Sequence, residues 1–550
     1  MEPVWLKSYP RAVDPAPPIP DGSVAELVAT HCRRFADREA FWSMGRSMNF
    51  GECYALAQAF AGWLHRQGVA PGERVAVMLP NVLAFPVVTY GALAGGHVLV
   101  NVNPLYTARE LVHQLKDAGA RTLVVWEPAL AVVESALAEL GLERIVSVAP
   151  DALLGAAGRR AARPAGAAPA RWSLEAALAD GAGERPPTAE VAASSPAFLQ
   201  YTGGTTGVSK GAVLTQRNVL ADLAQQLAWS SPFIPPERAP YRAITALPLY
   251  HIAALMAGMF RQLLLGGSCI LIANPRNLDE LVGTMATQRF TTMGGVNTLY
   301  AALLNHPRIR EVDFSHCFVS GAGATATQQP IVDGWQALTG MSIVEGYGMT
   351  ETCCYISQQP LDGRPFNGSV GLPYPLTEIS IRDPLDRELA PGEPGEICVR
   401  GPQVMAGYWN RPEETARVMT DDGYLRTGDI GSIDEGGWLR ISDRKKDVIL
   451  VSGFNVFPNE VEAVLLSHPG VLEAAVVSAP DPRSGEVPAA FVVRRDPALT
   501  EAQLRAYCAE QLTAYKCPKR IEFRDVLPKT PVGKILRRAL RDEAHRLAAG

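Results

Sequence analysis

Short apolar runs alternate with amphipathic stretches of helical period through the first two-thirds of the chain. RVAVML precedes one helical stretch, TLVVW precedes the stretch around ALAVVESALAEL, and CILIAN precedes LDELVGTMATQ. Strands that alternate with helices in this order favour parallel sheets whose faces are covered by helices. The pattern therefore predicts an α/β fold with mixed or parallel sheets for a large N-terminal domain.

One uncharged run, at residues 82–100, is long enough to raise the question of a membrane span. Pro86, the glycines that follow it and His97 argue against a span. A buried helix that ends near Gly95 and Gly96, followed by the buried strand HVLVNV, accounts for the run. Peripheral contact with a membrane is left open.

The pattern changes after residues 442–449, SDRKKDVI. NEVEAVLLSHPG predicts a helix ending at Gly470, and VLEAAVVSAP, AAFVVRR and RIEFRDVLP predict strands. Thr500 and Gln503 form a capping box that opens the helix EAQLRAYCAEQL, and KILRRALRDEAHRL predicts a last helix. We interpret this part as a small, mobile α+β domain. The predicted organisation is a large domain, a hinge in a solvated linker and a small domain, at residues 1–442, 443–447 and 448–550.

Length and charge narrow the class of protein. A chain of 550 residues exceeds what one core usually supports, so at least two domains are expected. The 51 basic and 56 acidic residues leave no positive excess for a nucleic-acid backbone. The 9 scattered cysteines do not form a disulfide framework. Together with an N-terminus that lacks the features of a signal peptide, they predict a protein of the reducing cytoplasm. Association with the cytoplasmic face of a membrane and a homodimer are both left open.

The stretch YTGGTTGVSKG, residues 201–211, offers backbone N–H groups, hydroxyls and the charge of Lys210 to a polyanion. It differs from a Walker loop, because Gly211 follows Lys210 where that motif needs Ser or Thr. AFLQYT and AVLT predict strands on both sides, and Thr215 can cap the next helix. A plain Gly-Thr turn would not need Lys210. We predict a loop that closes over the β- and γ-phosphates of a nucleotide.

A second stretch, EGYGMTE at residues 345–351, has glycines on both sides of Tyr347. These glycines allow close approach of the backbone and are expected to leave the ring exposed for stacking on a base. Thr350 offers a hydroxyl to phosphate, and Glu351 offers a hard oxygen ligand suited to Mg²⁺. Alone, the stretch is a weak signal.

Three shorter stretches complete the set. Asp429 in GYLRTGDIG suits ribose hydroxyls, and Arg444 in DRKKD offers a fork of donors. Lys534 in PVGKILRR follows a glycine at the start of a predicted helix. Each stretch alone is explained by a turn, an N-cap or a solvated charge, but their order and spacing together are not.

These five stretches, in this order, resemble the adenylate-forming (ANL) superfamily of acyl-CoA synthetases, firefly-type luciferases and peptide-synthetase adenylation domains. The resemblance covers the chain from about residue 25 onward. Longer phrases are similar to bacterial long-chain fatty-acid–CoA ligases: PLYHIAAL, NGSVGLPYP, GPQVMAGYWNRPEET, TGDIGSIDEGGWLRISDRKKDVILVSGFNVFPNEVE and LPKTPVGKILRRALRDE. The resemblance implies the adenylate-forming enzyme fold and an AMP-forming acid–thiol ligase.

The implied reaction has two halves, with ATP, Mg²⁺ and coenzyme A as cofactors and co-substrates. A fatty acid and ATP give acyl-AMP and pyrophosphate, and the thiol of coenzyme A then displaces AMP. Lys534 is implied to bridge the carboxylate and the phosphate oxygens, and Glu351 with Thr202 to hold Mg²⁺. Thr350 is implied to touch the α-phosphate, and His251 to sit at the mouth of the acyl pocket.

The resemblance also implies a nucleotide site, a hinge and a thiol path. Asp443 would be the hinge, and Ser452, Gly453 and Phe454 would line the coenzyme A tunnel. The residues implied to bind ATP or AMP are Thr202, Gly203, Gly204, Thr205, Thr206, Gly207, Lys210, Gly321, Ala322, Gly323, Ala324, Glu345, Gly346, Tyr347, Gly348, Met349, Thr350, Asp429, Arg444 and Lys534.

Departures from the family pattern leave the identity of the acid substrate undetermined. TCCY at residues 352–355 replaces the usual CAP or SP, Ala322 and Ala324 stand where long-chain ligases often have other residues, and SGEVPAAFVV resembles medium-chain and aryl ligases. A medium-chain or aryl acid–CoA ligase is therefore an alternative. Another is an acyl-AMP ligase that loads a carrier protein, although no obvious insertion follows Asp443. A non-catalytic nucleotide-binding regulator would be expected to lack Lys534 or Glu351.

Overall fold

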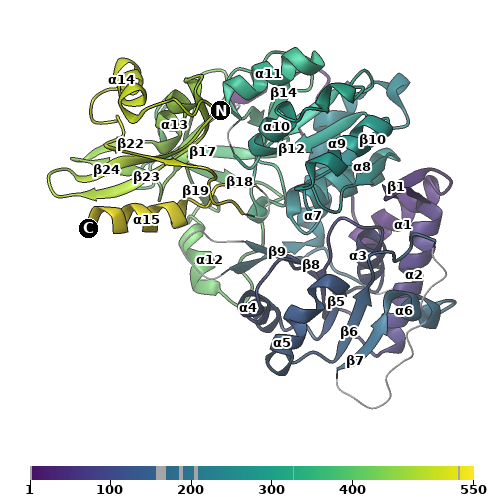
Figure 1. The fold of residues 1–550 in the computed structure, drawn as a ribbon. Helices are drawn as coiled ribbons and strands as arrows, with labels where there is room; N and C mark the ends of the chain where they lie inside the picture. The colour runs from purple at the N-terminus through teal and green to yellow at the C-terminus, as the bar shows by residue number, and fades with distance from the viewer. Residues whose placement is uncertain are drawn as a thin grey trace.

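The structure is a computed structural model that describes residues 3–155, 169–184, 190–202, 209–325, 327–530 and 533–549. The strands of these residues form four sheets, of seven, nine, four and five strands. In Figure 1 the seven- and nine-stranded sheets carry most of the helices, and the yellow C-terminal part lies at one side of the view.

The seven-stranded sheet has the order β7-β6-β5-β3-β4-β8-β9. Its neighbours are parallel except the last pair, β8 and β9, which is antiparallel. The strands are β3 Arg74–Met78, β4 Val98–Asn101, β5 Thr122–Trp126, β6 Arg144–Val148, β7 Ala170–Ser173, β8 Pro196–Thr202 and β9 Lys210–Thr215. Helices in this part of the chain are α1 Val24–Arg34, α2 Phe50–Arg66, α3 Ala84–Ala94, α4 Ala108–Ala118, α5 Leu130–Leu140 and α6 Leu174–Gly181.

The uncharged run at residues 82–100 belongs to this core, as predicted. It forms α3, in which ten of the eleven residues are buried, and then the fully buried strand β4. Within the described ranges, no helix combines the length and the apolar character needed to cross a bilayer.

The nine-stranded sheet has the order β16-β15-β14-β13-β12-β10-β11-β1-β2. Its strands from β14 to β1 in this order are parallel, while β2, β15 and β16 pair antiparallel at the edges. The strands are β1 Glu39–Ser43, β2 Arg46–Asn49, β10 Arg242–Thr245, β11 Ser268–Leu271, β12 Thr292–Gly295, β13 Val319–Ala322, β14 Ile343–Tyr347, β15 Ser357–Gln358 and β16 Leu372–Pro373. The two large sheets confirm the predicted α/β class.

Helices of the second sheet include a π-helical segment, η5, that runs directly into α8. The segments are α7 Gln216–Ser230, η5 Ala254–Phe260, α8 Arg261–Leu265, α9 Leu278–Thr287, α10 Asn297–Leu304 and α11 Gln329–Thr339. Trp335 of α11 is fully buried, with its ring centroid 4.8 Å from Tyr300 and 5.4 Å from Phe314. This aromatic cluster packs α10 against α11 and the sheet.

The remaining sheets are smaller. The four-stranded sheet, β17-β18-β19-β20, is antiparallel and is followed by the five-stranded sheet, β22-β21-β24-β23 with β25 parallel to β24. The strands are β17 Glu378–Arg382, β18 Gly395–Arg400, β19 Leu425–Ile433, β20 Leu439–Arg444, β21 Ile449–Val451, β22 Phe454–Val456, β23 Val471–Asp481, β24 Gly485–Arg494 and β25 Arg520–Arg524. The helices are α12 Pro412–Val418, α13 Pro458–Ser467, α14 Glu501–Gln511 and α15 Arg537–Ala549. The predicted α+β character of the C-terminal part and its Thr500–Gln503 capping box are confirmed.

Two local predictions for this part are wrong. The last helix begins at Arg537, so Lys534 precedes it. The Thr530 N–H donates to the Lys534 carbonyl at 2.7 Å, and the Lys534 N–H donates to the Thr530 hydroxyl at 3.1 Å. These bonds hold Lys534 in a closed turn outside the helix.

Asp443 is not in a solvated linker. It lies near the end of β20 and is 2% exposed. Its carboxylate accepts the N–H of Asn459, at the start of α13, and the N–H of Arg444, each at 2.8 Å. Asp443 therefore links β20 of the four-stranded sheet to α13, the first helix of the C-terminal part. The division of the chain at residues 443–447 stays a prediction.

Candidate active site

The phosphate-loop strands lie where they were predicted. β8 and β9 pair antiparallel, and Thr202 stands opposite Lys210 at the open end of the pair. A capping box of Thr215 and Asn218 starts α7 directly after β9. The predicted strands on both sides of the stretch are thus confirmed. Gly203, Gly204, Thr205, Thr206 and Gly207 lie outside the described residues.

Lys210 contacts two side chains from one distant segment. Its Nζ lies 2.5 Å from Glu414 Oε2, in α12, and 4.6 Å from the centroid of the Tyr408 ring. The segment reaches β9 because the Trp409 N–H donates to the Gly211 carbonyl at 2.8 Å. In the structure, the charge of Lys210 is therefore balanced by a carboxylate and faces an aromatic ring.

Tyr408 also reaches Glu351, so it joins two predicted site residues. Its hydroxyl donates to Glu351 Oε1 at 2.7 Å, and the Met405 N–H donates to the Glu351 carbonyl at 2.8 Å. Glu351 is 6% exposed, and burial raises the pKa of its carboxyl, while the bond from Tyr408 lowers it. The sequence analysis missed Tyr408. The only signal was its place in the phrase GPQVMAGYWNRPEET.

Close backbone approach explains the glycines of the second predicted stretch. A Cβ on Gly348 would lie 1.6 Å from the Cys354 carbonyl oxygen, and one on Gly323 would lie 3.0 Å from the Gly346 carbonyl oxygen. The predicted adenine segment, residues 321–324, therefore touches the start of EGYGMTE. Ala324 has a φ of 68°, a left-handed value that is uncommon for a residue with a side chain.

Glu345 opens this stretch and is buried. Its Oε1 accepts the N–H of Thr327 at 2.8 Å, and burial raises its pKa to about 7. Met349 and Thr350, at the end of the stretch, are half-buried. Thr350 begins the short helix η7, Thr350–Thr352, which packs against β8 and β9. This packing brings Glu351 to the phosphate-loop strands.

The ring of Tyr347 is not exposed, contrary to the prediction. It is 7% exposed, because Ile356, Leu372 and other apolar side chains surround it. Its hydroxyl donates to Asp429 Oδ2 at 2.7 Å, and Arg444 Nε lies 2.9 Å from Asp429 Oδ1. The two predicted ribose residues thus contact each other and Tyr347, and stacking of Tyr347 on a base stays a prediction.

Lys534 approaches this group from the C-terminal part of the chain. Burial and the charge of Arg444 lower its pKa to about 8, and Asp429 opposes the shift. Burial and the charge of Lys534 lower the pKa of His251 to about 4, so the imidazole is neutral at pH 7. The charges of Asp429 and Arg444 thus act on Lys534, and the charge of Lys534 acts on His251, although these residues are far apart in the sequence.

The loop that carries His251 is held from the first sheet. Asn81 forms three hydrogen bonds of 2.8–2.9 Å with the backbone of residues 245–249. The Gln200 amide, in β8, donates to the Tyr250 carbonyl at 2.7 Å. The position of His251 is thus coupled to the strand that leads into the phosphate loop.

The unusual TCCY stretch is mostly enclosed. Cys353 and Cys354 are 0% and 5% exposed, and Cys353 has a φ of 57°. Tyr355 is half-buried, with its ring centroid 5.1 Å from that of Tyr374. Asp222 of α7 lies beneath this stretch, and burial raises its pKa to about 7. Tyr355 is therefore the residue of this trio that offers surface to a substrate.

The predicted coenzyme A residues lie on an exposed hairpin. Ser452 and Gly453 have φ values of 52° and 86° and turn β21 into β22. Phe454 is 61% exposed, with its ring centroid 5.3 Å from that of Tyr515. Among the described parts of the chain, this hairpin makes no hydrogen bond to the predicted nucleotide residues.

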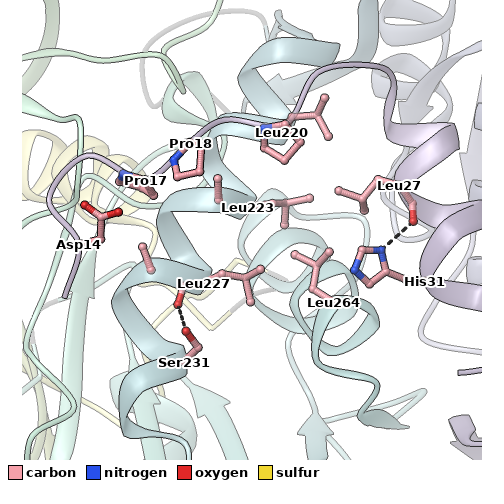
Figure 2. Close-up of a pocket in the computed structure, with 13 residues that line it drawn as sticks. Asp14, Pro17, Pro18, Leu27, His31, Leu220, Leu223, Leu227, Ser231 and Leu264 are labelled. Carbon is pink, nitrogen blue, oxygen red and sulfur yellow. Dashed lines mark hydrogen bonds between the residues drawn. The ribbon is translucent and has the colours of Figure 1, made fainter. Parts of the chain in front are cut away.

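An apolar groove of about 350 Å³ lies elsewhere, between the N-terminal segment, α1, α7 and α8. Proline, leucine and alanine supply most of its lining. In Figure 2 two polar groups turn back to their own helices: the His31 ring bonds the Leu27 carbonyl at 2.9 Å, and the Ser231 hydroxyl donates to the Leu227 carbonyl at 2.7 Å. None of the predicted site residues lines this groove.

The site residues would suit Mg²⁺ that is bound together with the phosphates of a nucleotide. Among the described residues, no three His, Cys, Asp or Glu side chains cluster as a ready-made metal cage. Mg²⁺ usually keeps several waters and binds through one or two carboxylates together with substrate phosphates. The buried Glu351 carboxylate, in η7 packed against β8, would suit such a single hard ligand, and its role with Thr202 in holding Mg²⁺ stays a prediction.

Comparisons with known proteins identify the family of the chain. The family model described as AMP-binding enzyme matches residues 28–409, and the AMP-binding enzyme C-terminal domain matches residues 460–534. A long-chain-fatty-acid–CoA ligase of Salmonella typhimurium is 46% identical over 557 residues, covering 99% of each chain.

Solved structures extend the likeness to the fold. ATP-bound MatB from Rhodopseudomonas palustris has a TM-score of 0.84 at 32% identity, over 95% of this chain and 99% of that chain. The anthranilate CoA ligase AuaEII in complex with anthranoyl-AMP has a TM-score of 0.87 at 26% identity, over 97% and 98% of the two chains. The resemblance found in the sequence is confirmed: the chain belongs to the AMP-binding enzyme family.

Proposed function

We propose that the protein is an ATP-dependent, AMP-forming fatty acid–CoA ligase, an acid–thiol ligase that uses Mg²⁺ and coenzyme A. One observation carries the proposal: the buried Lys534, from the end of the chain, lies within reach of the charges of the paired Asp429 and Arg444, in a chain whose full-length relative is a long-chain-fatty-acid–CoA ligase. A non-catalytic regulator would have no need for a buried cation at this point.

In the first half-reaction, the chain positions a carboxylate against the α-phosphate of ATP and neutralises charge. Lys534 supplies a positive charge between the carboxylate and the α-phosphate. Lys210 releases the Glu414 carboxylate and binds the departing pyrophosphate instead. Asp429 and Arg444 hold the ribose. Glu351 and Thr202 would hold Mg²⁺, which would supply positive charge to screen the phosphate oxygens.

In the second half-reaction, the small domain turns about Asp443. Lys534 then leaves, and the hairpin of Ser452, Gly453 and Phe454 comes to line the path of the thiol. The apolar surface of that hairpin supports this step, because Leu450 and Phe454 are 52% and 61% exposed, and neighbouring exposed apolar side chains can mark an interaction surface.

The acid is a medium to long aliphatic chain. The relatives named long-chain-fatty-acid–CoA ligases and the apolar stretch that follows His251 support this choice. The protein works in the cytoplasm, since all nine of its cysteines are free and eight of them are buried.

The test is AMP release with coenzyme A across carboxylates from acetate to oleate. We expect AMP and pyrophosphate as products, and the highest kcat/KM with a medium or long chain. Formation of ADP would refute the ligase chemistry. A preference for acetate, amino acids or dicarboxylates would refute the choice of acid.

The two poses are tested by measuring each half-reaction alone. Lys534→Ala should slow adenylation roughly 10²–10³-fold and leave thioester formation from supplied acyl-AMP nearly intact. Gly453→Trp should do the reverse, because a bulky ring blocks the path of the thiol. Asp443→Pro fixes φ at the hinge and should also separate the halves. Equal losses in both halves for the first two variants would contradict a two-pose mechanism.

A further inference from the structure

A threonine of the main body contacts the loop that carries Lys534. The Thr298 hydroxyl, in the first turn of α10, donates to the Gly533 carbonyl at 3.1 Å. Gly533 has a φ of 80°, and a Cβ there would lie 2.7 Å from Thr298 Oγ1. The backbone just before Lys534 therefore rests directly on α10.

Holding Gly533 also holds Lys534. The two bonds between Thr530 and Lys534 close the chain into a tight turn, and Gly533 N–H donates to the Thr530 carbonyl at 2.9 Å. Because the turn is closed on both sides, a restraint on the Gly533 carbonyl restrains the backbone of the next residue. The lysine side chain then extends from a fixed point.

The same helix holds the predicted adenine segment. The Tyr300 hydroxyl donates to the Gly321 carbonyl at 2.7 Å, and Asn297 Oδ1 accepts the N–H of Gln328 at 3.1 Å. α10 thus lies between the segment expected around the base and the turn that carries Lys534. It gives these two parts a common support.

We propose that Thr298 is a positioning residue that latches the Lys534 turn onto the body for the first half-reaction. This proposal rests on the proposed two-step function. The latch belongs to one pose only, because turning the small domain must break the bond to Gly533. Removing the Thr298 hydroxyl therefore lowers the population of the adenylating pose without touching the reacting atoms.

The experiment compares Thr298→Val, which keeps the shape and loses the hydroxyl, with Thr298→Ser, which keeps the hydroxyl. Thr287→Val is the matched control, since the Thr287 hydroxyl donates only within α9, to Gly283 and Thr284. Each half-reaction is measured alone in the full-length protein, with thermal unfolding as a check of folding.

We expect Thr298→Val to slow adenylation about five-fold, the effect of one lost hydrogen bond, and to leave thioester formation from acyl-AMP equal or faster. Thr298→Ser should restore adenylation, and Thr287→Val should change neither half. Equal loss in both halves, no loss in Thr298→Val, or no rescue by serine would overturn the latch. Failure of the proposed function has a different signature: Lys534→Ala would then leave adenylation unchanged.

Discussion

The pKa of Lys534 makes the first half-reaction sensitive to pH in a range where most lysines are fully charged. Burial and Arg444 lower that pKa from its usual value near 10.5 to about 8. Lys534 is mostly charged below its pKa, so the fraction of enzyme with a charged Lys534 falls as pH rises. It is about nine-tenths at pH 7 and about one-tenth at pH 9. Adenylation should therefore slow about ten-fold across this interval.

The assay is kcat/KM for ATP in acyl-AMP formation without coenzyme A, because this parameter reports groups of the free enzyme. At saturating ATP the decline should move to higher pH, since the bound phosphates favour the charged lysine. Thioester formation from supplied acyl-AMP serves as the internal control and should not decline over the same range.

Lys534→Arg gives the decisive comparison. Arginine stays charged throughout this range, so the variant should be slower than wild type but should lose the decline between pH 7 and pH 9. A wild-type profile that is flat to pH 10 would refute the lowered pKa. The same decline in Lys534→Arg would assign the titration to another group.

Three further substitutions test other parts of the site and core. Gly348→Ala places a methyl carbon 1.6 Å from the Cys354 carbonyl oxygen and should lower kcat/KM roughly 10²-fold by displacing the loop; near-wild-type activity would contradict this. Trp335→Ala empties a fully buried site and should cost about 3–5 kcal/mol in urea unfolding; a change below about 1 kcal/mol would be inconsistent with the packing. Tyr408→Phe removes the hydroxyl bonded to Glu351 and should raise the Mg²⁺ concentration for half-maximal activity about ten-fold, whereas an unchanged midpoint would exclude that role.

The parts of the fold that follow from local signals were predictable from sequence. The antiparallel strands around residues 201–211 and the helix capped by Thr215 depend on neighbours in the chain. The buried run at residues 82–100 was assigned correctly because its glycines, Pro86 and His97 disfavour a span. Periodicity and turn chemistry act over a few residues, so a sequence contains them directly.

Features made by distant contacts were not predictable in the same way. Tyr347 was expected to be exposed, and only the packing of Ile356 and Leu372 shows that it is buried. The hydroxyl of Tyr408 bonds to Glu351, which is 57 positions away in the sequence. The hydroxyl of Thr298 bonds to Gly533, which is 235 positions away. A hydrophobic pattern carries no information about such partners, and the resemblance supplied roles only at positions that match known motifs.

The pairing of β19 with β20 would give the proposed hinge at Asp443 an electrostatic consequence. Arg444 follows Asp443 directly and stands opposite Asp429 in this register. A chain that swivels at Asp443 must draw Arg444 away from Asp429 in the same stroke that withdraws Lys534. In the proposed mechanism the two cations would then leave the site together, after pyrophosphate has carried its negative charge away. The acyl-AMP left behind would be held by fewer attractive charges, so the movement that admits the thiol would also weaken the hold on the AMP that the thiol displaces.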